Sequence, residues 1–325
     1  MDFGFNKEQE MLRKSFAEFL WKECSFDVIR EIKKSENGYS KEIWKKMAQL
    51  GWLGLIFEEK FGGNQGSFMD LFLLFEEIGK VLLPSPLLMG NVLPGLIIQS
   101  TENEKDKDKF IPAMITGKKI PIIALYNEKG IIDKDRPAIK AKKDAGGYIL
   151  NGTRILVPYI ADEIIVCADV KGPGDNGPTL FAIRPDAEGV RITPIKVITD
   201  EKSYAVIFEN VKALDKDIIG KIGLGNTYID QAFPKAIVLK CGEMIGGLRR
   251  IIDMTVNYAK DRRQFGRAIG SFQAIQHYLA DMAIALEGAA LIASQAASLI
   301  SDNLQCEKEV SMAKAFISDA YKQST

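Results

Sequence analysis

Hydrophobic residues recur at intervals of three and four over the first 118 positions, which predicts amphipathic helices. Asn6 and Gln9 form a capping-box pattern ahead of the first helix. Ser40 is placed to cap a second helix that ends at Gly51. A third helix is expected over residues 68–83, and its predicted inward face consists of Leu71, Phe72, Phe75, Ile78 and Leu82.

The pattern changes in the middle of the chain, where short runs rich in Ile and Val alternate with turn residues. Gly146-Gly147 is a hairpin signal, Asn151-Gly152 is a second turn signal, and residues 173–178 (PGDNGP) suit a loop tip. We therefore predict an antiparallel sheet domain, either a barrel or a sandwich. The expected strands cover residues 120–126, 138–142, 148–150, 163–168, 179–183 and 205–208.

Long helical patterns return in the last third of the chain. One helix is expected over residues 226–260, and a second from Ser271, a plausible N-cap, to about residue 300. A third begins near Glu307 and is still helical at Thr325, which suggests that a C-terminal segment is missing. The fold class is thus α+β multi-domain. Its predicted parts are an N-terminal helical domain (1–118), an antiparallel β-barrel or sandwich domain (119–215) and an incomplete C-terminal helical bundle (216–325).

Composition narrows the possible functions. The 43 basic and 43 acidic side chains cancel, which argues against bulk electrostatic binding to nucleic acid. The single histidine, His277, excludes zinc sites built on several histidines. Four scattered cysteines indicate reduced, mostly buried thiols in a cytoplasmic protein. We find neither a signal peptide nor a long uncharged run, and expect no membrane insertion.

The most distinctive chemistry lies between the first two helices of the C-terminal bundle. Residues 258–267 (YAKDRRQFGR) and 269–277 (IGSFQAIQH) combine arginines, phenylalanines, glutamines and glycines. A guanidinium group matches phosphate oxygens, and an aromatic ring packs against a planar ligand. These residues therefore suit a phosphate-bearing, planar ligand, whereas the simpler alternative is a polar interhelix loop with solvated side chains.

The order of helices, sheet domain and bundle, together with these two motifs, resembles the acyl-CoA dehydrogenase family over the whole chain. Residues 50–55 (LGWLGL), 58–63 (EEKFGG) and 75–80 (FEEIGK) look like its N-terminal signatures. Residues 151–154 (NGTR) are similar to the turn before its flavin-contacting strand.

This resemblance implies that the chain binds FAD and oxidises an acyl-CoA thioester to the α,β-enoyl product, as in fatty acid and lipid degradation. Electrons would pass to an electron-transferring flavoprotein, and the chain would form a homo- or hetero-oligomer, either a dimer or a tetramer. The resemblance implies that Arg262 grips the FAD pyrophosphate of a neighbouring subunit. It also implies that Phe265 packs against the cofactor, that Gln273 bonds its adenosine diphosphate part, and that Gln264 belongs to the same cofactor-binding set.

Several positions depart from the family pattern. The segment 125–130 (LYNEKG) is shorter than the family's flavin loop and lacks its threonine and Gly-Ser-Asp tail. Leu156 stands where the family has tryptophan, and Pro158 replaces a hydroxyl residue. The family's catalytic base lies either near the C-terminus or at the position of Ala236, so neither location supplies one in these residues. Glu243, about two helical turns further along, is the remaining candidate, although it could equally be a surface or interhelix glutamate.

These departures resemble a divergent branch of the family, the subunits of bacterial heteromeric acyl-CoA dehydrogenases that degrade steroid side chains. Residues 241–247 (CGEMIGG) and 310–315 (VSMAKA) look like that branch as well. Four hypotheses stay open at this point. The chain is a catalytic acyl-CoA dehydrogenase, or a non-catalytic partner subunit that completes FAD sites across an interface, or a flavin enzyme of the same fold that acts on a nitroalkane or an N-hydroxylated compound. The fourth is a binding module without flavin.

Overall fold

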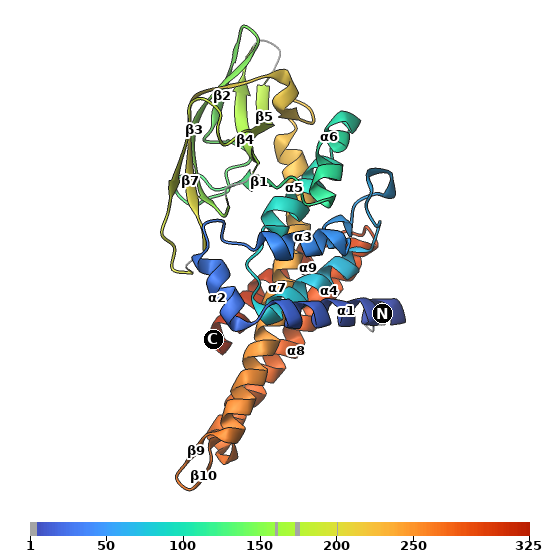
Figure 1. The fold of residues 1–325 in the computed structure, drawn as a ribbon, viewed down its shortest axis with the longest axis vertical. Coiled ribbons are helices and arrows are strands. Elements are labelled where there is room, and N and C mark those ends of the chain that lie inside the picture. Colours follow the sequence, from blue (N-terminus) through green and yellow to red (C-terminus); the bar gives the residue numbers. More distant parts are fainter. Residues whose placement is uncertain (1–4, 160–161, 173–175, 200) are drawn as a thin grey trace. The chain divides into compact units, whose positions relative to one another are not determined.

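We analysed a computed structural model of the 325-residue chain, which describes residues 5–159, 162–172, 176–199 and 201–325. The chain divides into two compact units (Figure 1). Neither unit is continuous in sequence, and the three sequential domains expected above stay a prediction. Unit 1 comprises Met1–Ile29, Gly66–Leu83 and Pro234–Thr325, and unit 2 comprises Arg30–Gln65 and Pro84–Phe233.

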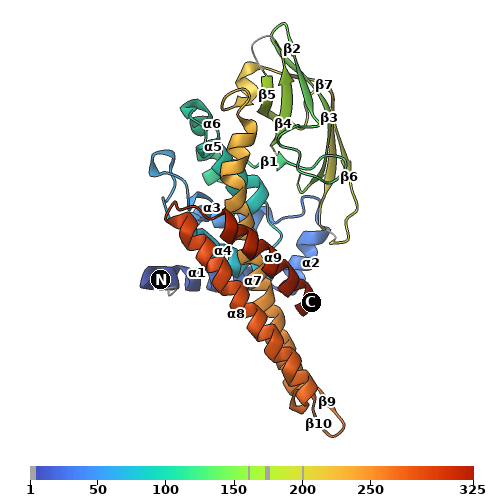
Figure 2. The ribbon, with the colours of Figure 1, turned by 180° about the vertical axis from the view of Figure 1, so that it is seen from behind.

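Unit 1 is helical. Helix α1 packs against α4, α4 against α8, and α8 lies along α9 (Figure 2). The predicted capping box is confirmed, because the Asn6 side chain accepts a hydrogen bond from the backbone of Gln9 and the Gln9 side chain accepts one from the backbone of Asn6. The helices of this unit are α1 (Lys7–Glu23), α4 (Phe68–Val81), most of α7 (Gly225–Asp261), α8 (Gln273–Ser301) and α9 (Glu307–Ser324), and α2 (Phe26–Lys34) begins in it.

Helix α4 crosses α7 at two glycines. A Cβ atom added to Gly79 would lie 1.9 Å from the backbone oxygen of Glu243, and one added to Gly246 would lie 1.8 Å from that of Glu76. The prediction that Leu82 faces inward is wrong, because its side chain is 53% exposed. Leu82 adopts a left-handed conformation as the C-cap of α4, which turns its side chain away from the buried face.

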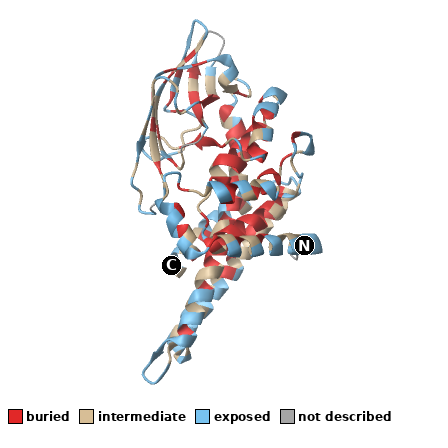
Figure 3. Cartoon of the chain, in the orientation of Figure 1, coloured by how far each residue is buried: buried red, intermediate tan, exposed pale blue. Residues whose placement is uncertain are grey.

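Helices α7 and α8 form a long hairpin whose distal part is largely exposed (Figure 3). The predicted N-cap of α8 is wrong: Phe272 is the capping residue, and the hydroxyl of Ser271 donates to the carbonyl of Ala268 in a preceding 3₁₀ turn. By length and composition, α8 could also cross a membrane, contrary to the sequence expectation. One such helix is weak evidence, because core helices of soluble proteins meet the same criteria, and α8 packs on α4 and α9.

Unit 2 combines helices with a single eight-stranded sheet in the order β6-β7-β3-β2-β4-β5-β8, with β1 paired to β4. The expectation of a purely antiparallel sheet is wrong, because β1 and β2 both run parallel to β4. Alternation along a strand sets which face is buried but carries no information on strand direction. The strands are β1 (Pro121–Ala124), β2 (Lys140–Asp144), β3 (Gly147–Val157), β4 (Glu163–Lys171), β5 (Asn176–Ile183), β6 (Val190–Pro194), β7 (Tyr204–Ala213) and β8 (Ile218–Ile219).

The helices of unit 2 bury aromatic and aliphatic side chains, among them Trp44, whose indole donates to the carbonyl of Gly117. Ser40 caps α3 as predicted. These helices are α3 (Lys41–Gln49), α5 (Leu93–Gln99) and α6 (Glu104–Ile115), followed by the first residues of α7.

Two of the three turn predictions in the sheet can be compared with the structure. Gly146-Gly147 closes the β2–β3 hairpin as expected. Asn151-Gly152 is not a turn but a register shift within β3, where the Asn151 side chain accepts a hydrogen bond from the backbone of Asn210. Of the loop tip expected at residues 173–178, residues 173–175 lie outside the described residues, and Asn176–Pro178 belong to β5.

Candidate functional site

The connection between α7 and α8 is a two-stranded hairpin with a strained tip. Strand β9 (Arg263–Gln264) pairs with β10 (Arg267–Ala268), so Phe265 and Gly266 form the two-residue turn, with φ of 52° and 78°. A turn with two left-handed residues favours Asn or Gly at its first position, and a bulky residue there is strained. The Phe265 side chain is 92% exposed, so packing within the chain does not compensate this strain. Such a residue points to a role outside the chain's own core.

Three arginines surround this tip. Arg262, Arg263 and Arg267 are exposed, and within the part of the chain that the structure describes none forms an ion pair with a carboxylate. The guanidinium of Arg267 lies 4.0 Å from the centroid of the Phe272 ring, and the Phe265 and Phe272 rings meet edge to face at 6.2 Å. Cations without counter-ions beside the exposed Phe265 ring and the half-buried Phe272 ring are suited to a ligand with phosphate groups and a planar ring system.

The other predicted residues of this region are all on the surface of the hairpin. Gln264 pairs with Arg267 across the two strands, and Gln273 is the first residue of α8. His277 is exposed one turn later. The structure therefore brings Arg262, Gln264 and Phe265 together at the tip.

Sequence reasoning missed the roles of Arg263, Arg267 and Phe272 in this cluster. The available signal was the Phe265-Gly266 dipeptide, because a two-residue turn there pairs Gln264 with Arg267 and Arg263 with Ala268, which gathers the arginines at one tip.

A second irregularity lies in β3 of unit 2. The pairing of β3 with β7 shifts between Arg154 and Val157, and Leu156 takes a left-handed φ of 55° with its side chain 37% exposed. Bulges of this kind redirect a side chain and are frequent beside active sites. After Pro158, the Tyr159 ring packs edge to face on Tyr39 at 5.9 Å.

Comparison with known proteins decides the family. The model of the acyl-CoA dehydrogenase N-terminal domain matches residues 6–118, and that of the C-terminal domain matches residues 223–325. The short/branched chain specific acyl-CoA dehydrogenase of Rattus norvegicus is 30% identical, over 97% of this chain and 74% of its own length. The chain belongs to the acyl-CoA dehydrogenase family.

Other relatives of the family extend the comparison. The caffeyl-CoA reductase-Etf complex subunit CarC of Acetobacterium woodii is 29% identical, over 97% of this chain and 85% of its own length. PigA with FAD and proline superposes with a TM-score of 0.89 at 27% identity, covering 100% of this chain and 87% of PigA. A steroid acyl-CoA dehydrogenase, Tcur3481-Tcur3483, reaches a TM-score of 0.85 at 26% identity, covering 98% of this chain and 84% of that one.

These findings confirm the predicted family and fold, and FAD is the cofactor of this family. The residues of the hairpin tip fit that cofactor, because guanidinium groups without carboxylate partners match its diphosphate and the two phenylalanine rings match its planar portions. The likeness to a steroid enzyme named for two chains agrees with the expected divergent branch.

The candidate base Glu243 lies on α7 in unit 1. Its carboxylate accepts a hydrogen bond from Lys240 at 2.8 Å, and its side chain is 28% exposed. The ion pair involves Oε1 of this carboxylate. Ala236, at the family's alternative base position, is buried and has no ionisable group. The assignment of Glu243 stays a prediction.

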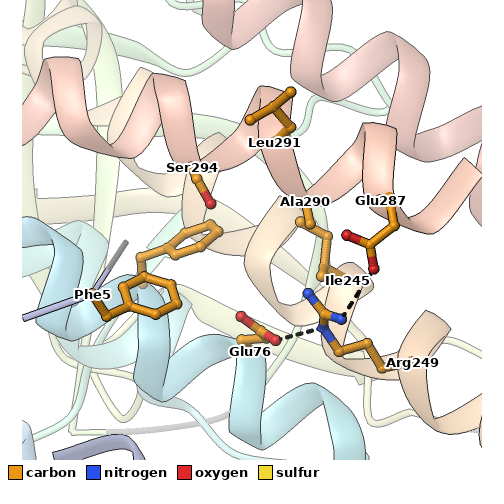
Figure 4. Close-up of a pocket in the computed structure, with 9 residues that line it drawn as sticks. Phe5, Glu76, Ile245, Arg249, Glu287, Ala290, Leu291 and Ser294 are labelled. Atoms are coloured by element: carbon orange, nitrogen blue, oxygen red, sulfur yellow. Dashed lines mark hydrogen bonds and ion pairs between the residues drawn. The ribbon is translucent and has the colours of Figure 1, made fainter. Parts of the chain in front are cut away.

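Glu76, in the family-like segment 75–80, has a structural role. The Glu76 carboxylate is 4% exposed and accepts a hydrogen bond from Arg13 of α1 at 2.7 Å. It accepts a second one from Arg249 of α7 at 2.8 Å (Figure 4). It borders a cavity of about 200 Å³ within unit 1, where Arg249 also lies 3.8 Å from Glu287. Two guanidinium groups compensate the charge of Glu76, so this buried carboxylate ties three helices together rather than acting as a free base.

The cysteines offer no reactive thiol beside these features. Burial raises the pKa of Cys24 and of Cys167 to about 12, and that of Cys241 to about 11. These three thiols are therefore protonated at neutral pH and are weak nucleophiles. Among the residues that the structure describes, no group of three or more His, Cys, Asp or Glu side chains is arranged to hold a metal ion.

Proposed function

We propose that this chain is an FAD-dependent acyl-CoA dehydrogenase that introduces an α,β double bond into an acyl-CoA thioester and passes the electrons to an electron-transferring flavoprotein. The observation that carries this proposal is the strained hairpin tip, where Phe265 is exposed beside three arginines without carboxylate partners. Backbone strain at an exposed residue lowers stability with no gain in packing, so its coincidence with three exposed arginines supports a ligand-binding role.

The names of two relatives support the finer parts of the proposal. A mammalian relative acts on short or branched acyl-CoA substrates, and a bacterial relative is a subunit of a complex with an Etf. Both match this chain over 97% of its length. On that basis we propose acyl-CoA as the substrate class of this chain and an electron-transferring flavoprotein as its partner. We also propose that the protein acts as an oligomer in the cytoplasm.

Each residue of the tip has a distinct task in this proposal. Arg262 and its two neighbouring arginines bind the diphosphate through charge-assisted hydrogen bonds. Phe265 and Phe272 supply apolar ring surface to the planar portions of the cofactor. Gln264 and Gln273 offer amide donors and acceptors that fix its orientation. When bound, FAD supplies the acceptor for the hydride that leaves the β-carbon.

Proton removal from the α-carbon needs a carboxylate. Glu243 is the candidate in this chain, and its carboxylate is paired with Lys240 through Oε1.

A second function is favoured by one specific observation. Ala236 stands at one family base position, and Pro158 replaces the hydroxyl residue after the β3 bulge. The first change removes an ionisable side chain and the second removes a hydroxyl group, while the arginine-rich tip is kept. We therefore propose, as the alternative, a non-catalytic partner subunit whose hairpin tip completes the FAD site of a neighbouring chain, and the two-chain name of a steroid relative supports it.

Substitution of Arg262 tests the cofactor assignment. The Arg262→Ala variant loses the guanidinium that binds the diphosphate, so the FAD-to-protein ratio after gel filtration, measured by absorbance near 450 nm, should fall at least tenfold. A tenfold loss of affinity corresponds to about 1.4 kcal/mol of binding free energy. Arg184→Ala is the matched control, because Arg184 is an exposed arginine paired with Asp186 in unit 2 and should leave the ratio unchanged. Unchanged flavin content in Arg262→Ala would exclude the assignment.

A further inference from the structure

Arg154 is the largest fully buried side chain of the described residues, at 1% exposure. Its guanidinium reaches three different segments of unit 2. Nη1 donates to Asp133 at 2.5 Å and to the carbonyl of Leu125 at 3.4 Å, and Nη2 donates to the carbonyl of Cys167 in β4 at 3.0 Å. One side chain therefore links the end of β1, the loop that follows it, and β4 to the middle of β3.

The arrangement is costly for an arginine that only fills the core. Its Nε is buried without an acceptor among the described residues. A buried donor without a partner lowers stability, and a buried ion pair is often no more stable than well-packed apolar residues of the same volume. Some other property of the chain must therefore favour this pair.

Asp133, the ion-pair partner of Arg154, also bonds other residues of the loop. Its second carboxylate oxygen accepts hydrogen bonds from the backbone of Ala138 at 2.7 Å and from the Asn127 side chain at 3.3 Å. The loop over residues 125–138 is therefore held from both ends by one carboxylate, and this carboxylate is held in turn by Arg154. The first part of this loop, residues 125–130, is the segment that departs from the sequence of the family's flavin loop.

The loop that this pair holds also bonds β3 beside the bulge. Ile155, the residue after Arg154, donates its backbone N–H to the carbonyl of Tyr126 at 3.0 Å, so the loop adds a bridge to β3 where its pairing with β7 shifts. Leu156 follows directly in its left-handed conformation. The loop and the bulge thus form one unit whose anchor is the buried Arg154–Asp133 ion pair.

We propose that Arg154 and Asp133 are positioning residues that hold the 125–138 loop and the Leu156 bulge as a preformed surface for the flavin. This inference rests on the proposed function for the identity of the ligand, whereas the linkage of loop and bulge rests on geometry alone. The pair acts through the backbone it fixes and does not itself touch the cofactor.

The test is the double variant Arg154→Met, Asp133→Asn. It removes both buried charges together, so that no uncompensated charge is left, and the asparagine amide oxygen can still accept from Ala138. The control is Arg184→Met, Asp186→Asn, which removes an ion pair that is exposed on both sides. Melting temperatures of both variants establish that comparisons are made on folded protein.

The first readout is amide hydrogen exchange of the FAD-free chain. We expect exchange in peptides covering residues 125–138 and 153–159 to accelerate at least tenfold in the double variant, with peptides of the β4–β5 pair and the control variant unchanged. The second readout is FAD retention, which should fall in the double variant at a temperature where the sheet is still folded.

Unchanged exchange over residues 125–138 would overturn the inference, and so would accelerated exchange with full FAD retention. A wild-type chain that bound no FAD, either alone or co-expressed with a homologous subunit, would instead overturn the proposed function, while the exchange experiment on the FAD-free chain would still decide whether the pair fixes the bulge.

Discussion

At the residue scale, Asp106 shows how burial changes a side chain that the sequence presents as solvated. It lies in a run of charged residues on α6, yet it is 6% exposed and accepts a hydrogen bond from the backbone of Gly220 at 2.8 Å. Burial raises its pKa above the ordinary value, and the hydrogen bond from Gly220 opposes this only in part.

This shift predicts a pH dependence of stability. Because the folded-state pKa of Asp106 lies above the unfolded value of about 3.9, the folded chain binds this proton more tightly. The contribution to stability is therefore full below that pH and is lost as pH rises through the folded pKa. Asp106→Asn keeps an acceptor for Gly220 and removes the titration, so the free energy of unfolding should fall less between pH 4 and pH 7 than in the wild type.

Urea unfolding at both pH values measures this difference. Asp108→Asn is the matched control, because Asp108 lies two residues away on the same helix and is exposed. The attribution to Asp106 would be wrong if both variants followed the wild-type pH dependence.

At the element scale, the helices could be predicted well and the sheet only in part. Capping at Asn6 and Ser40 has a local cause, since each side chain bonds a backbone three residues away. The start of α8 could not be read this way, because Ser271 bonds Ala268 instead of capping. Strand direction could not be predicted either. Strand β4 runs parallel to both β2 and β1, and which strands pair depends on which segments meet in space.

The glycine crossing of α4 and α7 gives a prediction at this scale. Gly246→Ala places a methyl group against the backbone oxygen of Glu76, which cannot move without shifting α4, so we expect a loss of about 1–3 kcal/mol in the free energy of unfolding. Gly288→Ala in α8 is the control, because its methyl group would meet only the Phe316 ring, which is partly exposed and can turn. Equal stability of the two variants in urea would contradict a rigid crossing.

At the scale of the whole molecule, both units are assembled from separated segments of the chain. The proposed cofactor-binding tip belongs to unit 1 and the β3 bulge to unit 2. The two proposed functions differ in whether this chain alone supplies the groups that bind FAD and remove the proton, or whether a neighbouring chain supplies some of them. Conservation of the family fold does not decide this, because activity resides in particular side chains.

Expression alone and with a homologous subunit separates these functions. A catalytic chain purified alone should retain FAD and reduce an artificial electron acceptor in the presence of an acyl-CoA, with turnover lowered at least tenfold by Glu243→Gln if Glu243 is the base. Lys240→Gln is the control, because it removes the ion pair and leaves the Glu243 carboxylate in place. A chain that gains flavin only on co-expression, with turnover insensitive to Glu243→Gln, would contradict the catalytic function and favour the partner subunit.

The sequence by itself determined the helical pattern, the family and the arginine-rich motif, because periodicity, capping and motif spacing are local properties that survive without the fold. It also exposed the departures at Ala236 and Pro158. Only the tertiary structure showed that Phe265 is strained and exposed, that Arg154 pairs with Asp133, and that two arginines neutralise Glu76. Ion pairs and burial join residues far apart along the chain, and the energies that hold them depend on the three-dimensional surroundings of each charge.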